Sequence, residues 1–429
     1  MFVVGDEVDM RRAAIELAGR GWKPTAIGRK LGRSREWVRV WLGRYRTEGE
    51  LGLVDRSRQP RNSPSRFPDE VIAEIVAVRR FLDADRFANS GAGAVAAEIE
   101  RRAVLGRVPS LSSIKRVLTE AGLTRPYRKR RRSTISVLGL PKVTAPGVWQ
   151  QSDWVQDRLL EGGIRFSSLQ ISDVGSHLMS AGQHRQRTLL AAVGQLTNRA
   201  WPAMSIPLAM GTDNAFSKTS HPNNPWTVWI KVLLMFGVEP IVSPPNSLGF
   251  TNHIEAVNWL WQDRTINRHR YASLEELTID NLGFLEWANT RRAILDPDLC
   301  GTRYPADYVT AHASTLRWPP PGFNIGDYLD GTDTPRIPLT RGRVTFLRYV
   351  NPDHTIEIAN TPWPVPPSLP IGVLVVAAIN TDNANLEIRH RGELVARHHY
   401  PMSPATIDPY HPATNNGLLD HLPTMSRTL

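Results

Sequence analysis

The sequence predicts a multidomain fold, with all-α modules at the N-terminus, a central α/β core and a small β-barrel near the C-terminus. Its 429 residues exceed what one ordinary hydrophobic core organises. Apolar residues follow a helical period before about residue 124, and strand and helix patterns alternate after residue 146. Short strand-like segments separated by turn residues follow residue 335. These changes in periodicity divide the chain into three architectures.

The composition narrows the class of protein. Hydrophobic residues make up 41% and charged residues 22% of the chain, which excludes a wholly disordered or collagen-like protein. No apolar run approaches the ~18 residues of a membrane span, and the start, MFVVGDEVDM, is acidic where a signal peptide is basic. The single cysteine, Cys300, excludes an internal disulfide and a cysteine-cluster zinc site. We therefore expect a cytoplasmic protein with no membrane partner.

Charge is distributed unevenly along the chain. The net charge of +11 comes from 52 Lys and Arg against 41 Asp and Glu. The first 145 residues hold 30 of these basic and 16 of these acidic residues, so the remainder is slightly acidic. This split indicates an N-terminal region that binds a polyanion such as nucleic acid. A basic face that only aids solubility is the alternative.

Residues 9–54 have the pattern of a helix-turn-helix unit. A first helix ends near Gly21, residues 25–31 form a second helix, and Ser34 is a candidate N-cap for a third. The third helix has an apolar stripe at helical spacing from Val38 onward and a basic opposite face. Such a helix enters the major groove of DNA, and a three-helix bundle with a solvated basic face is the alternative. The predicted DNA contacts are Arg33, Arg35 and Arg39.

A second helix-turn-helix-like module and a basic run follow. Residues 108–123 form an amphipathic helix that carries Lys115 and Arg116 on its polar side, and both are predicted to contact DNA. Residues 125–132 hold six basic residues in eight positions, and such a run stays extended until it meets phosphates. A localisation signal or a solvated linker is the competing interpretation. The run's predicted DNA contacts are Arg128, Lys129, Arg130, Arg131 and Arg132.

Strand-like and helix-like segments then alternate, which predicts a mixed sheet covered on both faces. The expected core strands are 148–156, 165–172, 205–210 and 240–242, and the expected helices are 186–196, 226–236 and 252–267. The expected β-barrel strands are 342–350, 354–360, 372–379, 385–390 and 393–400. The expected domains are a helix-turn-helix domain (1–56), a linker (57–68), a second helix-turn-helix-like domain (69–124), a basic linker (125–145), the α/β core (146–300), a linker (301–334), the β-barrel (335–402) and a disordered tail (403–429).

Three acidic residues stand where separate elements of the core can meet. Asp153 lies in the first expected strand, Asp213 follows the strand 205–210, and Glu255 lies in the first turn of the long helix. Carboxylates suit Mg²⁺ or Mn²⁺, and two such ions would activate an attacking oxygen and stabilise a leaving one. The residues alone leave three other acids available: Asp157, Asp173 and Asp263.

The motifs around these acids resemble the integrase core of DDE transposases and retroviral-type integrases. They are WQQSDW, TDNAF and SPPNSLGFTNHIEAVN, and the last matches the family pattern at Ser243-Pro244, Asn252, Glu255 and Asn258. EWANTRR (286–292) resembles a Tyr-Asn-x-x-Arg stretch of bacterial insertion-sequence transposases, and the N-terminal unit is similar to the helix-turn-helix of that group. The resemblance covers roughly residues 10–300.

The resemblance implies an RNase H-like core in which Asp153, Asp213 and Glu255 are catalytic and bind Mg²⁺ or Mn²⁺, two ions per site. It implies a DNA transposase or integrase that cuts element ends with water and joins the freed 3′-hydroxyl to target DNA by in-line phosphoryl transfer. The expected partners are double-stranded DNA, contacted also by Asn252 and Asn258, and further copies of the chain. The expected location is the bacterial cytoplasm at the nucleoid, with the need for helper proteins left open.

Some positions depart from the family pattern or allow two interpretations. Ala215 and His253 replace glycines, which alone adopt positive φ freely, and 41 residues, a slightly long interval, separate Asp213 from Glu255. A second hypothesis is therefore a catalytically inactive, transposase-derived repressor or target selector, and a third is a plain RNase H-like nuclease. His253 is either a phosphate or water contact or a surface residue, and Asn258 and Gln262 either contact DNA or pack between helices. Four tryptophans are expected in the core rather than stacked on bases: Trp226, Trp229, Trp259 and Trp261.

Overall fold

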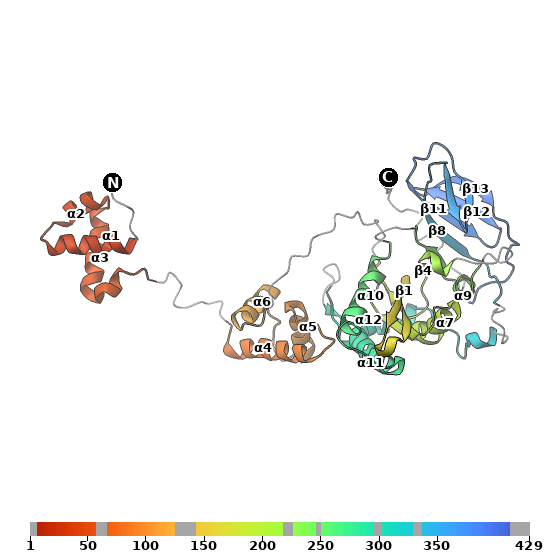
Figure 1. Cartoon of the computed structure of the whole chain (residues 1–429), viewed down its shortest axis with the longest axis horizontal. Coiled ribbons are helices and arrows are strands. Elements are labelled where there is room, and N and C mark those ends of the chain that lie inside the picture. The colour runs from red at the N-terminus through yellow and green to blue at the C-terminus, as the bar shows by residue number, and fades with distance from the viewer. Residues whose placement is uncertain are drawn as a thin grey trace. The chain divides into compact units, whose positions relative to one another are not determined.

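The structure is a computed structural model of the full chain, shown in Figure 1. It describes residues 7–56, 67–124, 143–217, 226–245, 250–295, 302–328 and 337–411. The chain divides into two compact units, Met1–Pro68 and Asp69–Leu429. Among the described helices, none is long and apolar enough to cross a membrane.

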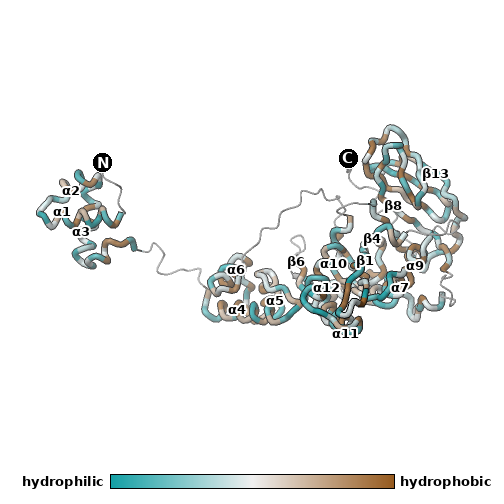
Figure 2. Tube along the Cα trace, in the orientation of Figure 1, coloured by the Kyte–Doolittle hydropathy of each residue, from teal (hydrophilic) through white to brown (hydrophobic). Residues whose placement is uncertain are grey.

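The first unit is a bundle of three helices, α1 (Glu7–Gly19), α2 (Pro24–Leu31) and α3 (Arg35–Glu48). The predicted cap of the third helix is confirmed, because the Ser34 hydroxyl accepts a hydrogen bond from the Trp37 backbone N–H at 3.0 Å. Gly32 ends α2 in a left-handed conformation. Hydrophobic and polar residues interleave along these helices (Figure 2), as expected of amphipathic helices. The helical class predicted for this region is therefore confirmed.

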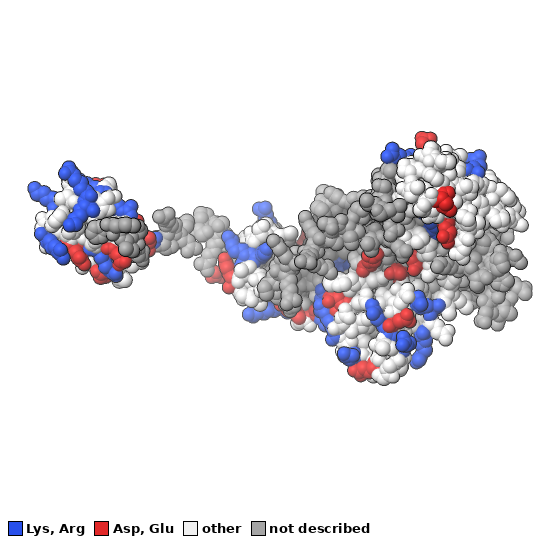
Figure 3. All heavy atoms as spheres, turned by 45° about the horizontal axis from the view of Figure 1, so that its top comes forward, with Lys and Arg blue, Asp and Glu red and all other residues white. Residues whose placement is uncertain are grey.

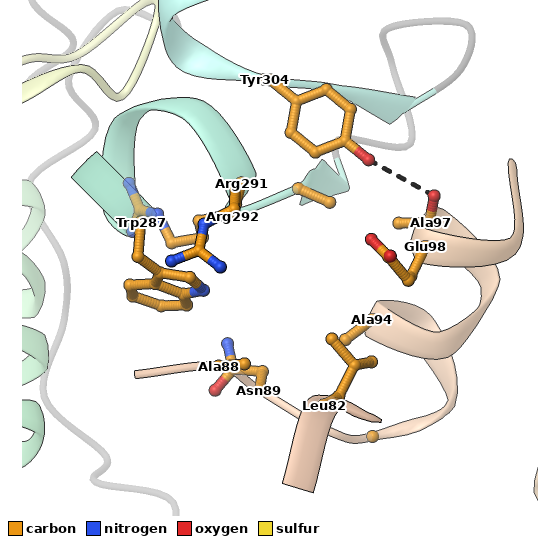
Figure 4. Close-up of a pocket in the computed structure, with 12 residues that line it drawn as sticks. Leu82, Ala88, Asn89, Ala94, Ala97, Glu98, Trp287, Arg291, Arg292 and Tyr304 are labelled. Atoms are coloured by element: carbon orange, nitrogen blue, oxygen red, sulfur yellow. Dashed lines mark hydrogen bonds between the residues drawn. The ribbon is translucent and has the colours of Figure 1, made fainter. Parts of the chain in front are cut away.

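The second unit begins with α4 (Asp69–Ala84), α5 (Ala92–Arg102) and α6 (Leu111–Glu120). The Ser110 hydroxyl caps α6 by accepting from Ser113 N–H, and the predicted apolar stripe of α6 is buried at Ile114, Val117 and Leu118. This α4–α6 module packs directly on the core that follows it. Figure 4 shows the boundary, where the Tyr304 hydroxyl of the core donates to the Ala97 carbonyl at 3.3 Å across a cavity of about 150 Å³.

Side chains on both sides fasten the α4–α6 module to the core. Arg86 pairs with Asp280 at 2.8 Å, and Arg291 pairs with Asp85 at 2.9 Å. Each pair joins a residue that follows α4 closely to a residue of the core helices. The module and the core are therefore parts of one compact unit.

The core is built on a nine-stranded mixed sheet in the order β13-β12-β11-β8-β5-β4-β1-β2-β3. Antiparallel pairing joins β1, β2 and β3, whereas β4 and β5 run parallel to β1. The strands are β1 (Trp149–Leu159), β2 (Arg165–Asp173), β3 (Met179–His184), β4 (Ala209–Thr212), β5 (Glu239–Val242), β8 (Arg343–Tyr349), β11 (Leu374–Asn380), β12 (Asn385–His390) and β13 (Glu393–His399). The predicted α/β class of the core is confirmed, and β3 is a strand that the sequence pattern did not indicate.

Helices supply separate clusters of buried side chains to this sheet. One cluster joins α7 and α9 to strands of the core, and another joins α10 and α11 to β1, β2 and β3. The helices are α7 (Leu189–Gln195), α8 (Trp201–Met204), α9 (Val228–Met235), α10 (Asn252–Arg264), α11 (Leu274–Glu286) and α12 (Pro305–Ala311). Trp226, Trp229 and Trp261 are buried as predicted, but Trp259 is 53% exposed, so its placement in the core is wrong.

The C-terminal strands continue the core sheet. Strand β8 pairs in parallel with β5, through Ile241 beside Thr345 and Val242 beside Phe346. Two further strands, β9 (Thr355–Ile358) and β10 (Thr361–Pro364), form a hairpin. The described strands from β8 onward thus form an extension of the core sheet and a hairpin, and the expected separate β-barrel is not confirmed.

Two segments expected to lack structure contain ordered parts. The expected linker 301–334 includes α12, and short strands β6 (Ile294–Leu295) and β7 (Thr302–Arg303) pair just before it. Within the expected tail, Tyr410 N–H donates to the Met235 carbonyl at 2.8 Å and its ring contacts Phe236. Residues 412–429 and the basic run 125–132 lie outside the described residues. The domain boundaries remain predictions.

Candidate active site

Sheet register brings the first two predicted acids together. Strands β1 and β4 are parallel neighbours, with Gln150 beside Met210 and Gln151 beside Gly211. Two residues further along each strand are Asp153 and Asp213. Because parallel strands keep step with each other, this register places Asp153, within β1, beside Asp213, which directly follows β4. This pairing brings together two acids that are separated by 59 residues of chain.

The third acid is brought in by α10, whose start is tied to β1. The Gln151 side chain donates to the Phe250 carbonyl at 2.9 Å and accepts from Ile254 N–H at 3.1 Å. One turn beyond Glu255, the Asn258 amide donates to Asp153 Oδ2 at 2.7 Å. These bonds hold the first two turns of α10 against the strand that carries Asp153.

The pKa of Asp153 depends on the charges of Asp213 and Glu255. Burial, then the negative charge of Asp213, and more weakly that of Glu255, raise the pKa of Asp153 to about 6. The hydrogen bonds from Trp154 N–H and the Asn258 amide favour the charged form and oppose this rise in pKa. Asp153 therefore lies within electrostatic reach of Asp213 and Glu255.

The other two acids have local partners as well. Asp213 caps the short turn Asn214–Phe216, because its Oδ1 accepts from Ala215 N–H at 2.9 Å. Glu255 Oε1 accepts from the Thr251 hydroxyl at 2.6 Å. Among the described residues, no three His, Cys, Asp or Glu side chains stand close enough together to hold a metal ion. The three acids thus converge on one region without forming a closed ligand set.

The two departures from the family pattern impose no backbone strain. Neither Ala215 nor His253 is among the described residues with a positive φ. The His253 ring is directed to β2, where its Nε2 lies 2.9 Å from the Ser172 hydroxyl. Burial, together with the charges of His177 and Arg292, lowers the pKa of His253 to about 3. His253 is therefore neutral and partly buried, and it lies against Ser172 of β2.

Two of the alternative acids have structural roles instead. Asp173 is fully buried and accepts hydrogen bonds from Gly147 N–H and from the Ser176 backbone and hydroxyl, which hold the turn after β2. Asp263 pairs with Arg268 at 3.2 Å on α10. Neither acid contributes to the raised pKa of Asp153.

The described basic residues predicted to contact DNA are exposed or partly exposed on their helices. On α3, Arg35 and Arg39 are exposed, whereas Arg33 is partly buried and forms an ion pair with Glu7. On α6, Lys115 and Arg116 are exposed. Lys and Arg side chains gather over the first unit (Figure 3). Asn252 is exposed at the start of α10, while the amide of Asn258 is engaged by Asp153.

The sequence did not indicate two residues that organise the site. Gln151 is a polar residue inside a buried strand, a local signal that its side chain has a structural partner. Arg348, in β8, donates to Asn214 Oδ1 from 134 residues away, and nothing in the local sequence around it marks that contact. A cavity of about 380 Å³ opens beside Arg348 and Asn214, and Trp226, Glu357 and Tyr400 also line it.

Comparison with known protein families identifies the N-terminal region. Residues 6–54 match one model described as a Homeodomain-like domain, and residues 37–118 match another of the same description. The N-terminal region is homeodomain-like. This agrees with the helix-turn-helix predicted for it and with the observed α1–α3 bundle. No curated protein matches the sequence of the chain.

Solved structures with partial similarity include retroviral integrases. The catalytic core domain of HTLV-2 integrase, in a dimeric form with magnesium, is 12% identical over 38% of this chain and 97% of that chain, with a TM-score of 0.29. A simian T-cell lymphotropic virus intasome, in complex with a PP2A regulatory subunit B56 gamma, is 12% identical over 65% and 91%, with a TM-score of 0.33. Scores this low do not establish a shared fold, so the core is interpreted from its own strands and side chains.

Proposed function

We propose that the chain is a DDE-type DNA transposase or integrase that binds element ends and catalyses metal-dependent DNA cleavage and strand transfer. The observation that carries this proposal is the parallel register of β1 and β4, which sets Asp153 beside Asp213 while Asn258 of α10 bonds to Asp153. The motif context of all three acids supports it, as does the homeodomain-like front end. In this proposal the mixed sheet is an RNase H-like core.

The donor set suits a hard divalent cation. Asp153 and Asp213 offer carboxylate oxygens on neighbouring strands. The pKa of Asp153 is raised partly by the negative charge of Asp213, and a bound cation would oppose that effect. When bound, Mg²⁺ or Mn²⁺ would supply a polarised phosphate and an activated attacking oxygen. For Glu255 to join as a ligand, its side chain must leave the Thr251 hydroxyl. Asn258 would keep Asp153 oriented toward the ion.

The helical modules would supply DNA affinity. Exposed Arg35 and Arg39 on α3 are suited to phosphates and base edges of the major groove, and Lys115 and Arg116 on α6 extend the contact. Joining two element ends requires two active sites on one DNA complex, so the active form would be an oligomer. Double-stranded DNA and further copies of the chain are the proposed partners.

A strand-transfer assay with labelled candidate terminal repeats tests the proposal. Cleaved and joined products in Mg²⁺ or Mn²⁺ support it, and cuts without joined products indicate a nuclease instead. Tight DNA binding without any cleavage would favour the second candidate, an inactive DNA-binding derivative. One observation favours that candidate, since the described acids do not form a closed metal-ligand cluster.

A further inference from the structure

We infer that Arg348, contributed by the C-terminal strand β8, is a positioning residue that holds the Asp213 turn of the active site. The inference rests on the proposed function for its catalytic meaning. Its structural part, a direct bond between the C-terminal strands and the turn after β4, stands on the contacts alone.

The Arg348 guanidinium bonds to both loops that flank the site. One terminal nitrogen, Nη2, donates to Asn214 Oδ1 at 2.8 Å, and the other, Nη1, donates to the Ser243 carbonyl at 3.0 Å. The Asn214 amide donates to the same Ser243 carbonyl at 3.1 Å. Asn214 directly follows Asp213, and Ser243 directly follows β5. The three groups form a closed triangle that fixes the two strand ends relative to each other.

The Arg348 guanidinium is buried, so losing one of its hydrogen bonds would be destabilising. Arg348 is 5% exposed, and its Nε donates to the Glu357 carbonyl at 2.8 Å, so the guanidinium is bonded on each side. A buried charge is tolerated when its hydrogen bonds are satisfied. Loss of the guanidinium would remove the donor that bonds to the Asn214 oxygen and would leave the buried Ser243 carbonyl with the Asn214 amide as its side-chain donor.

Sheet pairing explains how a residue so distant in sequence reaches the site. Strand β8 lies beside β5 in parallel register, with Phe346 beside Val242. Arg348 lies two residues after Phe346 and Ser243 lies one residue after Val242, so both residues follow the paired positions closely. The C-terminal strands therefore complete the edge of the active site, and their role extends beyond any contact with DNA.

A matched control lies in the same strand. Arg343 is 8% exposed, and its Nε is 3.5 Å from Glu239 Oε1 at the opposite end of β5. Arg343→Ala removes an equally buried arginine without touching the Asp213 turn. Arg348→Lys keeps the positive charge and a hydrogen-bond donor but loses the forked guanidinium. It is the variant to measure if Arg348→Ala does not fold.

The experiment uses the full chain and two readouts. Hydrogen exchange of peptides covering residues 209–217 measures order at the turn independently of catalysis, and steady-state cleavage at saturating DNA measures kcat. For Arg348→Ala we expect exchange at the turn to be faster by about tenfold and kcat to fall by about 10²-fold with DNA affinity retained. Arg348→Lys should lie between, and Arg343→Ala should leave both readouts at the turn unchanged. Asn214→Ala combined with Arg348→Ala should add little to Arg348→Ala alone.

The two readouts separate the possible failures. Unchanged exchange at the turn in Arg348→Ala and Arg348→Lys, or the same effect from Arg343→Ala, would overturn the inference. If the wild-type chain cleaves no DNA but the exchange pattern is as expected, the proposed function fails while the positioning contact stands. A fall in kcat accompanied by an equal loss of DNA binding would indicate a general structural defect and would also overturn the inference.

Discussion

The N-terminal bundle and the acidic site differ in how their functional side chains are positioned. On α3, the cap Ser34, the buried stripe and the exposed Arg35 and Arg39 all lie within one short stretch of chain. At the acidic site, Asp153, Asp213 and Glu255 come from two strands and a helix separated by many residues. Helix caps and helical periodicity are enough to position the side chains of α3. The side chains of the acidic site are positioned by strand register and by polar side chains that link separate elements.

This difference predicts different responses to mutation. A surface arginine of α3 can be removed without disturbing its neighbours, so its loss should change binding and little else. Asp153, in contrast, accepts a hydrogen bond from Asn258 and is repelled by two other carboxylates. Its loss should therefore change catalysis, the pH dependence of stability and stability itself together.

The largest effect is expected for Asp153→Asn. The change keeps the shape but removes the charge beside Asp213, so we expect cleavage of labelled element ends to fall by at least about 10³-fold. DNA binding, measured by fluorescence anisotropy, should persist. Asp263→Asn is the matched control, because Asp263 lies in an ion pair with Arg268 on the surface of α10. Cleavage by Asp153→Asn at the wild-type rate would refute the assignment of the acids.

The next effect concerns the other region. Arg35→Ala combined with Arg39→Ala should weaken DNA binding by the full chain, and the slope of log affinity against log salt should fall by about 2 if both contact phosphates. Anisotropy titrations at several salt concentrations give both quantities. Glu36→Ala, on the same turn of α3, is a control that removes an exposed side chain of opposite charge. An unchanged salt slope would remove α3 from the DNA interface.

A smaller effect is expected on stability. The pKa of Asp153 is raised to about 6 in the folded chain, so its charged form opposes folding, and this penalty grows as pH rises from about 4 through 6. In metal-free protein, Asp153→Asn should raise the free energy of unfolding by about 1–2 kcal/mol at pH 8 and by much less at pH 4. Urea unfolding at the two pH values measures this, and equal effects at both would contradict the raised pKa.

The smallest effect is expected at the boundary of Figure 4. The ion pair Arg86–Asp280 joins the same two parts of the chain and is partly exposed, so Arg86→Ala should lower the stability of the second unit by less than about 1 kcal/mol. The loss should shrink further at high salt. Thermal melts at two salt concentrations test this. A loss of several kcal/mol would show that the α4–α6 module depends on that pair.

The same contrast explains what the sequence could predict. Ser34 marks a helix start by its own chemistry, so the third helix is predictable together with its cap, whereas the cap Ser110 is seen only in the structure. The continuation of the core sheet into β8 was not, because strand pairing joins segments that no local pattern connects. Strand β3, whose sequence is MSAGQH, lacks the alternation and β-branched residues that mark a strand. The candidate acids were chosen through motif resemblance, and the roles of Gln151 and Arg348 required the assembled sheet.

The most direct measurement is anomalous X-ray diffraction from crystals of the full chain grown with Mn²⁺. If the three acids act as one metal site, an anomalous peak will lie between the carboxylates of Asp153 and Asp213, and Glu255 will have left the Thr251 hydroxyl to approach it. Manganese bound only elsewhere, or no manganese beside Asp153 and Asp213 at millimolar Mn²⁺ with element-end DNA present, would contradict the proposed catalytic site.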